Sequence, residues 1–288
     1  MRISYGALVC IIAVATAMNV FVWHTVFVHN DQSLRVSILD VGQGDSILVQ
    51  GPTGIQMLID AGPDRSVSRQ LPKEIGILDR SIDLVVETHP DKDHIAGLPG
   101  VFGTYVISYF LSPGISNDTA ITHTVEDSVM REPNAKSFIA RRGMRIHLGG
   151  TAYADVLYPD HDVSKGETNA GSVTMRVVYG DTSFLLTGDL PSEQEDYLMS
   201  RYGTEGLESD VLKAGHHGSK HSTDAVWLTA VQPSIVAISA GKGNTYGHPN
   251  PEVLERIQRE GATVYSTIDS GTIRFVSDGV AVQTKTQR

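Results

Sequence analysis

Several apolar segments of this chain end in short polar groups that are rich in aspartate and histidine. The densest group covers residues 88–94 and directly follows the apolar segment 82–86. Further apolar segments end in the same way, at Asp60, Asp189, His216 and His217. Polar side chains after the carboxyl ends of strands lie where α/β folds place their binding sites. The pattern therefore favours an α/β fold with one site assembled from several strand ends.

The residue types at these ends are those that bind metal ions. Segment 88–94 alone carries His89, Asp91, Asp93 and His94, and imidazole with carboxylate suits zinc, manganese or iron. Any one of these ends is more often a turn than a ligand group, because Asp and Gly are favoured in turns. Their repetition along the chain instead predicts a centre for divalent ions.

The rest of the sequence predicts a single domain over residues 34–288, since no low-complexity linker divides it. Strands are predicted at 34–40, 46–50, 56–60, 82–86, 172–179, 183–186, 211–214, 235–239, 263–265 and 272–276. Helices are predicted at 94–102, 192–202, 224–231 and 251–260. Two strand-rich halves flanked by helices predict two sheets packed face to face with helices outside, an αββα sandwich of the α/β class.

The composition limits both the way in which a polyanion can be bound and the residue types that can bind a metal ion. The formal net charge of −10 argues against a broadly basic surface that coats nucleic acid, so a polyanionic substrate has to be attracted locally. The single cysteine, Cys10, lies in the apolar N-terminal stretch, so the following domain forms no internal disulfide and no cysteine-based zinc site. Metal ligands must then be His, Asp, Glu or Asn.

Residues 1–30 are predicted to be a membrane anchor or a signal segment. The apolar run 7–23 is close to the ~20 residues that span a bilayer, and Arg2 precedes it while Asp31 follows it. This charge order places the domain outside the cytoplasm, as a single-pass membrane protein. A cleaved signal peptide, and hence a secreted protein, is the alternative, because residues 15–17 form a small-x-small cleavage pattern.

These motifs, in this order, resemble those of the metallo-β-lactamase superfamily. A nearer resemblance is to the hydrolase domain of ComEC-type DNA-uptake channel proteins, and it is carried by segments 39–46, 88–94, 187–189, 215–220 and 244–249. The resemblance covers nearly the whole chain after residue 34. It implies the metallo-β-lactamase fold and a metal-dependent hydrolase.

The resemblance also implies roles for individual residues. Asp93 and His94 correspond to ligands of one ion, Asp189 to the bridging carboxylate and His216 to the last ligand, with His217 as the alternative if the register slips by one. His89 corresponds to a ligand of the other ion. Asp60 corresponds to an acid that orients the ligand loop through hydrogen bonds.

Two positions depart from the fuller family pattern. Asp91 stands where the motif has a second histidine, and Asn169 stands near the place of a later histidine. Both make the first site richer in oxygen, which favours manganese or magnesium over zinc there. Two ions, zinc or manganese, are expected to lower the pKa of a shared water toward about 7 and so to supply the nucleophile.

Weaker candidates surround this centre. Asp45 either faces the metals or caps the first turn, and His248 is placed at a substrate phosphate by the resemblance, with a turn histidine as the alternative. Lys213, Ser219 and Lys220 are expected near the mouth, where they can contact phosphate oxygens.

The function expected from the resemblance is a phosphodiesterase or nuclease that acts on DNA at the outer face of the membrane, linked to DNA uptake and to a separate membrane channel protein. One alternative is a hydrolase of another anionic ester, such as a cell-envelope polymer, which the acidic balance favours. The other is a noncatalytic, metal-stabilised module that partners a channel.

Overall fold

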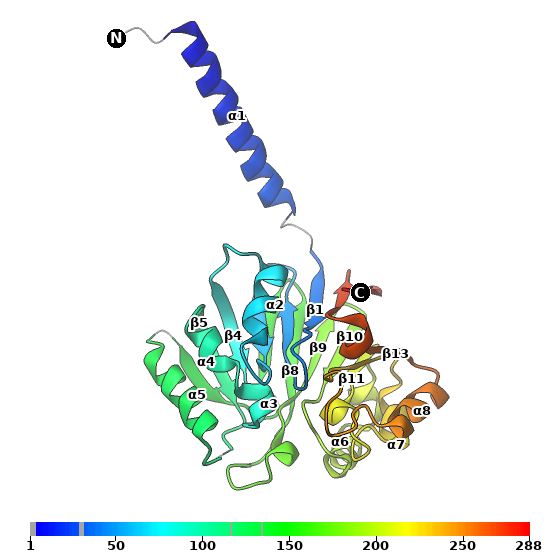
Figure 1. Cartoon of the computed structure of the whole chain (residues 1–288). Helices are drawn as coiled ribbons and strands as arrows, with labels where there is room; N and C mark the ends of the chain where they lie inside the picture. Colours follow the sequence, from blue (N-terminus) through cyan, green and yellow to red (C-terminus); the bar gives the residue numbers. More distant parts are fainter. Residues whose placement is uncertain (1–3, 29–31, 116, 134) are drawn as a thin grey trace.

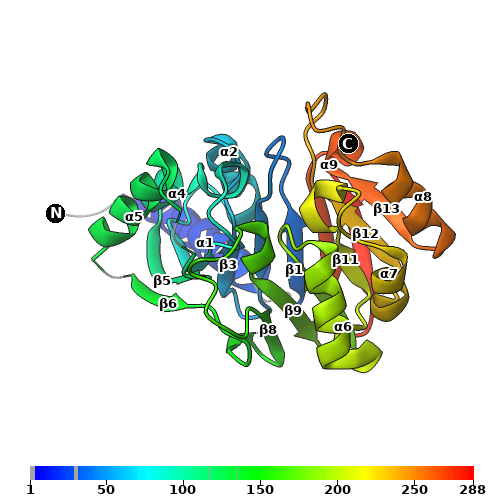
Figure 2. The same ribbon diagram turned by 90° about the horizontal axis from the view of Figure 1, so that it is seen from below.

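Two mixed β-sheets form the centre of the molecule, and helices cover their outer faces (Figure 1). The structure is a computed structural model that describes residues 4–28, 32–115, 117–133 and 135–288. Figure 2 looks from below and shows α2, α4 and α5 on one side of the strands and α6, α7 and α8 on the other. The layers are therefore helix, sheet, sheet and helix, as predicted from the two strand-rich halves.

The first sheet has eight strands in the described residues. In spatial order they are β15 (Val282–Thr286), β14 (Ile273–Ser277), β1 (Leu34–Ile38), β2 (Ile47–Gln50), β3 (Gln56–Ile59), β4 (Ser81–Val86), β5 (Val106–Ser112) and β6 (Lys136–Ile139). The part from β15 to β3 is antiparallel, and the pairs from β3 to β6 are parallel. The carboxyl ends of β3 and β4 thus lie at the same edge.

The second sheet has seven described strands. In spatial order they are β13 (Thr263–Ser266), β12 (Ile235–Ile238), β11 (Val211–Lys213), β10 (Thr182–Leu186), β9 (Thr174–Tyr179), β8 (Ala152–Tyr158) and β7 (Arg145–Gly149). The four strands from β10 to β13 are parallel neighbours. Their carboxyl ends bring the residues after β10 and β11 together.

Alternating side chains along the strands build separate core layers, as the two-residue period of a strand requires. Leu84 and Val86 of β4 pack between the sheets, whereas Val85 packs against the helices of the first sheet. On the second sheet, Leu212 of β11 packs with Trp227 under the helices. Apolar burial on both faces of each sheet holds the strand ends in fixed positions.

The helices fall into two groups, one for each half of the chain. Those beside the first sheet are α2 (Ser66–Ile75), α3 (Lys92–Ile95), α4 (Leu98–Phe102) and α5 (Ala120–Arg131). Those of the C-terminal half are α6 (Ser192–Leu207), α7 (Ala225–Val231), α8 (Pro251–Arg259) and α9 (Thr267–Ser270). Two short 3-10 turns, η1 (Asn169–Gly171) and η2 (Gly215–Gly218), lie next to strand ends. The single helix predicted at 94–102 is wrong, because α3 and α4 are separate.

The N-terminal helix α1 (Tyr5–Val28) stands apart from the sheets in Figure 1. The sequence predicted a transmembrane helix within residues 1–30, of which 1–3 and 29–30 lie outside the described residues. Across the part of the chain that the structure describes, no helix combines the length and the apolar character that crossing a membrane requires. The prediction of a transmembrane helix is therefore not borne out.

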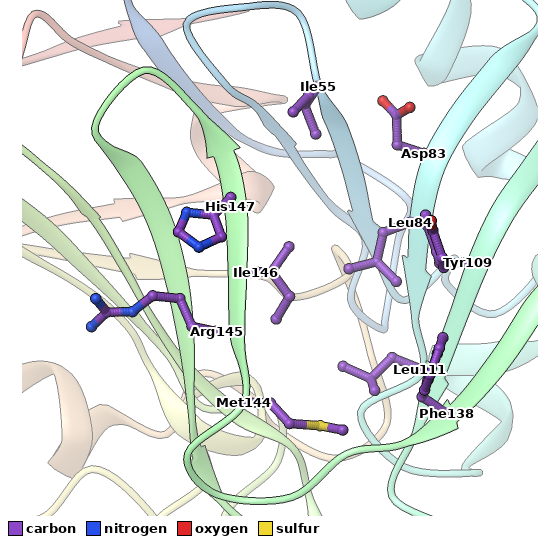
Figure 3. Close-up of a pocket in the computed structure, with 10 residues that line it drawn as sticks. All are labelled: Ile55, Asp83, Leu84, Tyr109, Leu111, Phe138, Met144, Arg145, Ile146 and His147. Carbon is purple, nitrogen blue, oxygen red and sulfur yellow. The ribbon is translucent and has the colours of Figure 1, made fainter.

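An apolar cavity of about 530 Å³ opens at one end of the sandwich, between β5 and β6 of one sheet and β7 of the other (Figure 3). Its lining residues are Ile55, Asp83, Leu84, Tyr109, Leu111, Phe138, Met144, Arg145, Ile146 and His147. None of the site residues predicted from the sequence lies among them. The predicted site residues lie instead at the carboxyl ends of the strands.

Candidate metal centre

Four buried side chains from four separate segments converge at the edge where the strands end. They are Asp45, His94, Asp189 and His217, and one ligand-type atom of each lies within 4.8 Å of the others. Asp45 lies in the turn before β2, His94 in α3 after β4, Asp189 after β10 and His217 in η2 after β11. Two imidazoles and two carboxylates in one place form a donor set for a divalent metal ion.

Asp189 lies at the centre of this group. Its Oδ2 atom is 3.3 Å from His94 Nε2, 3.2 Å from His217 Nε2 and 3.8 Å from His216 Nε2. Its backbone N–H donates to Ser172 Oγ, which fixes the start of the turn after β10. One carboxylate oxygen thus faces three imidazole nitrogens.

The remaining predicted ligands of segment 88–94 border the group. Asp93 Oδ2 lies 3.3 Å from His217 Nε2, and Asp91 Oδ2 lies 3.8 Å from His89 Nε2. Both aspartates are about one-third exposed, whereas His89 is fully buried. The His89 ring packs on the His94 ring with centroids 4.1 Å apart. The two aspartates therefore form the open, solvent-exposed side of the centre.

Several buried polar atoms of this centre lack a hydrogen-bond partner among the described residues. The Nε2 atoms of His89, His94 and His217, together with Oδ1 of Asn169, are buried and have no hydrogen-bond partner in the part of the chain that the structure describes. Buried polar atoms are nearly always hydrogen-bonded, because an unpaired one costs ~1–3 kcal/mol. Atoms of this type, clustered and unpaired, are accounted for by coordination of metal ions, so the residues present fit a metal centre.

Asp60 orients the ligand loop. Its Oδ2 lies 2.7 Å from His94 Nδ1 and accepts a hydrogen bond from Thr88 Oγ1 at 2.6 Å, while its Oδ1 accepts from the Thr88 backbone N–H at 2.8 Å. A carboxylate acceptor holds the proton on Nδ1 of His94 and leaves Nε2 free to bind a metal. Asp60 itself has a positive φ of 57°, a conformation that the surrounding contacts must stabilise.

The two adjacent histidines after β11 occupy different environments. His217 is buried and its Nδ1 donates to the carbonyl oxygen of Ser239 at 3.0 Å, so its Nε2 faces the cluster. His216 is about one-third exposed and lies at the open side. Both have positive φ angles, 47° and 54°, which turn the backbone sharply. The structure thus brings His217, the alternative ligand, into the four-residue group and places His216 beside it.

Two further predicted residues lie at the border of the centre. Asn169 begins η1, and its Oδ1 is among the unpaired buried atoms. His248 lies in the loop before α8, and its ring packs edge-on to the His216 ring with centroids 5.6 Å apart. Nδ1 of His248 is also buried without a partner among the described residues. Both side chains therefore retain free acceptor or donor capacity next to the cluster.

The three residues expected at the mouth lie in different places. Lys220 is exposed, whereas Ser219 is buried. Lys213, the last residue of β11, is fully buried, pairs with Asp45 and donates to the carbonyl oxygen of Gly188 at 2.8 Å. Because the side chain points into the centre and not toward solvent, Lys213 is not a residue of the mouth. A lysine at the end of an otherwise apolar strand is the sequence feature that could have indicated a buried ion pair.

Opposite charges determine the ionisation of the buried groups. Burial opposes ionisation of Asp189, yet the neighbouring His217, His94 and Lys213 hold its pKa well below the usual range. Burial likewise disfavours the charged form of His94, but Asp189 and Asp60 raise its pKa well above the ordinary value. The pKa of His217 is raised in the same way by Asp189 and Asp45, so without metal the protons on His94 and His217 balance the carboxylates. Binding of a metal ion must displace these protons, so affinity falls as pH falls.

Several contacts that support the ligands were not predicted from the sequence. Thr88 Oγ1 lies 3.0 Å from His89 Nδ1, and Ser172 Oγ lies 3.3 Å from the same atom. Gly44 is required nearby, because its φ is +137° and a Cβ there would lie 2.0 Å from the carbonyl oxygen of Asp93. The glycine of the first turn is visible in the sequence and is typical of close packing. The contacts of Thr88 and Ser172 with His89, by contrast, depend on tertiary structure.

Comparison with protein families gives a match over most of the domain. The family described as "Metallo-beta-lactamase superfamily" matches residues 39–242. This range contains every member of the four-residue group, and it begins at the first turn and ends after β12. The match therefore includes the whole candidate centre.

Individual proteins show the same relationship. The chain is 31% identical to "ComE operon protein 3" of Bacillus subtilis (strain 168), over 84% of this chain and 33% of that protein. It is 29% identical to "Competence protein ComA" of Neisseria gonorrhoeae, over 85% and 32% respectively. The chain thus spans about a third of the length of these relatives. Among solved structures, Zn(2+)-bound PqqB from Methylobacterium extorquens is similar in fold, with a TM-score of 0.55, 14% identity and coverage of 81% of this chain and 97% of that chain.

Proposed function

The chain belongs to the metallo-β-lactamase superfamily, and from this premise we propose that it is a metal-dependent phosphodiesterase that cleaves DNA. The observation that carries the proposal is the convergence of buried imidazole Nε2 atoms without hydrogen-bond partners on the carboxylate of Asp189. A buried His/Asp centre in this superfamily supports a metal-dependent hydrolase. The identity of the substrate, a DNA phosphodiester, is an additional inference that rests on the observations below.

The chain's own residues supply ligands and proton transfer. His94, His217 and Asp189 would hold one ion, and His89 with Asp91 and Asn169 would help to hold a second. Divalent ions held there would act as Lewis acids and would lower the pKa of a bound water to about 7. The donors around the second position include more oxygen, which favours manganese there, whereas the first suits zinc or manganese.

Two side chains are suited to the reacting groups. Asp93 lies at the open side, 3.3 Å from His217 Nε2, where its carboxylate can accept a proton. His248 lies next to His216 with a free Nδ1, where its imidazole can donate to a phosphate oxygen or to the leaving group. No serine or cysteine nucleophile is needed for this hydrolysis.

Two observations favour DNA over other esters. One of the relatives above is named a competence protein, and the exposed Lys220 and Lys242 lie on the segments that carry His216 and His248. Local cations and metal ions can attract a phosphate even though the formal net charge is −10. The same acidic balance favours the second candidate, hydrolysis of a phosphoester in a cell-envelope polymer. Action outside the cytoplasm, next to a separate channel protein, stays a prediction from the sequence.

The test is metal analysis of the full chain combined with cleavage assays. Manganese-loaded protein is expected to cleave single-stranded DNA, duplex DNA or both, as well as a small phosphodiester, and Asp189→Ala is expected to abolish all of these activities. Cleavage of the small phosphodiester with no cleavage of either DNA form, across salt concentrations, would refute the nuclease proposal and favour the envelope-ester hydrolase.

A further inference from the structure

An exposed tyrosine lies beside the candidate centre, on the loop between β12 and α8. Tyr246 is 69% exposed, and its ring is stacked on the ring of His248 with an angle of 25° and a centroid separation of 5.9 Å. The imidazole therefore shields part of the ring. The rest of the ring is open to solvent and available for contact with a ligand.

Asn244 holds this loop in one conformation. Its side-chain amide donates to the carbonyl oxygens of Gly241 and His248, and its Oδ1 accepts from the backbone N–H groups of Tyr246 at 3.1 Å and His248 at 3.0 Å. Four hydrogen bonds from one side chain tie both ring-bearing residues to the same anchor. A ring fixed before binding loses little conformational entropy when a ligand packs on it.

A continuous series of rings connects Tyr246 to the buried cluster. The His248 ring lies 5.6 Å from the His216 ring, which lies 6.0 Å from the His217 ring. His216 and His217 both have Nε2 within 3.8 Å of Asp189 Oδ2. A phosphate bound between the metal centre and His248 would therefore have Tyr246 close by, because the rings of Tyr246 and His248 are neighbours.

We propose that Tyr246 is the stacking platform for a nucleobase adjacent to the scissile phosphate, and that the enzyme therefore takes single-stranded nucleic acid as its substrate. This inference rests on the proposed phosphodiesterase function. Stacking of a base on an aromatic side chain contributes ~1–3 kcal/mol and does not depend on the sequence, because every base has a π-face. In a duplex the bases are already stacked on their neighbours, so only an unpaired strand can offer a free face to the ring.

The test compares Tyr246→Ala, Tyr246→Phe and the wild-type full chain, with Tyr109→Ala as the control. Tyr109 is also exposed, at 44%, but it lines the cavity at the open end of the sandwich. The substrates are a single-stranded oligodeoxynucleotide, an abasic strand of equal length and the matching duplex. Binding is measured separately, by fluorescence anisotropy of the labelled strands on manganese-loaded protein.

Tyr246→Ala is expected to raise KM and Kd for the base-bearing single strand by ~5- to 100-fold, with a much smaller change for the abasic strand and for kcat. Tyr246→Phe is expected to stay near the wild type, because the phenyl ring keeps its π-face, and Tyr109→Ala is expected to have no effect. Equal losses on the base-bearing and abasic strands, or no loss with Tyr246→Ala, would overturn the stacking role. Absence of cleavage by the wild type refutes the proposed function instead, and the anisotropy comparison then still decides the role of Tyr246.

Discussion

Lys213 and Asp45 form a buried ion pair at the inner side of the metal centre. The Lys213 ammonium contacts Asp45 Oδ2, lies 3.5 Å from Asp189 Oδ1 and donates to the carbonyl oxygen of Gly188. Asp45 is one of the four grouped side chains, yet its charge is already matched by a protein cation. Asp189 directs Oδ1 toward the lysine and Oδ2 toward the histidines, so the lysine fixes which oxygen is presented to a metal ion.

We predict that Lys213→Met destabilises the metal-free protein by about 3–5 kcal/mol, because it removes the ammonium partner of the buried Asp45 and leaves only the His217 imidazole beside that carboxylate. Urea denaturation in the presence of a chelator measures this free energy of unfolding. The double variant Asp45→Asn with Lys213→Met removes both charges and is expected to recover part of the loss. The exposed Lys220→Met serves as the control. A single variant as stable as the wild type would show that the pair is not needed.

The metal ligands of η2 are predicted to differ in importance. His217→Ala is expected to lose metal from the cluster and to reduce hydrolysis by about 100-fold or more, because His217 Nε2 is one of the buried, unpaired atoms that face Asp189. His216→Ala, at the open side, is expected to retain more of the metal. Metal content after dialysis and catalytic rate measure both effects. The reverse order of metal loss would restore His216 as the principal ligand.

Local signals explain why much of the fold was predictable. The strands around Asp60 and Asp189 are apolar and end in turn residues, so both their position and their polar ends are visible in the sequence. The missed elements include β6, all four residues of which are exposed, and α2, which contains Pro72. An exposed edge strand lacks the alternation of apolar residues, and a proline within a helix weakens the helical pattern.

The details of the site depend on tertiary structure that a sequence pattern does not contain. Adjacent residues of a strand point to opposite faces, so a choice between His216 and His217 needs the register and the left-handed turn after β11. The direction of Lys213 depends on the close approach of the turn that carries Asp45. His94 and Asp189, by contrast, lie at ends whose order along the chain already predicted their convergence.

Stability is predicted to fall as pH rises through the range in which Glu87 ionises. Burial, together with the charges of Asp60 and Glu126, raises the pKa of Glu87 from 4.5 to about 8. Because the pKa is raised in the folded state, the neutral carboxyl stabilises the fold below pH 4.5, and this contribution is lost as pH rises toward 8. We expect a loss on the order of a few kcal/mol, measured by urea denaturation at pH 5 and pH 8.

Glu87→Gln is expected to remove most of this dependence, since an amide keeps the shape of the neutral acid and does not ionise. The exposed Glu255→Gln provides the matched control and is expected to leave the slope unchanged. A wild-type stability that is flat between pH 5 and pH 8 would contradict the raised pKa. A slope that persists in Glu87→Gln would assign it to another group.

Substitutions of Asp60 can distinguish two roles of this residue, the orientation of the His94 ring and the stabilisation of the local backbone. Asp60 accepts hydrogen bonds from Thr88 and holds the proton on Nδ1 of His94, while its φ is 57°. Asparagine tolerates this left-handed conformation but offers a neutral amide, whereas alanine loses the hydrogen bonds and is also strained. Asp60→Asn is therefore expected to fold with nearly wild-type stability and to bind manganese or zinc ~10- to 100-fold more weakly.

Asp60→Ala is expected to show the same weakening of metal binding and, in addition, a loss of stability of the metal-free protein, because the buried Thr88 and His94 donors are left unpaired. Isothermal titration with metal ions and urea denaturation in chelator measure the two effects separately. If Asp60→Asn binds metal as tightly as the wild type, the carboxylate does not orient His94, and the cluster then depends on the packing of α3 against the first turn. That result would make Gly44, whose missing side chain permits this packing, the next residue to substitute.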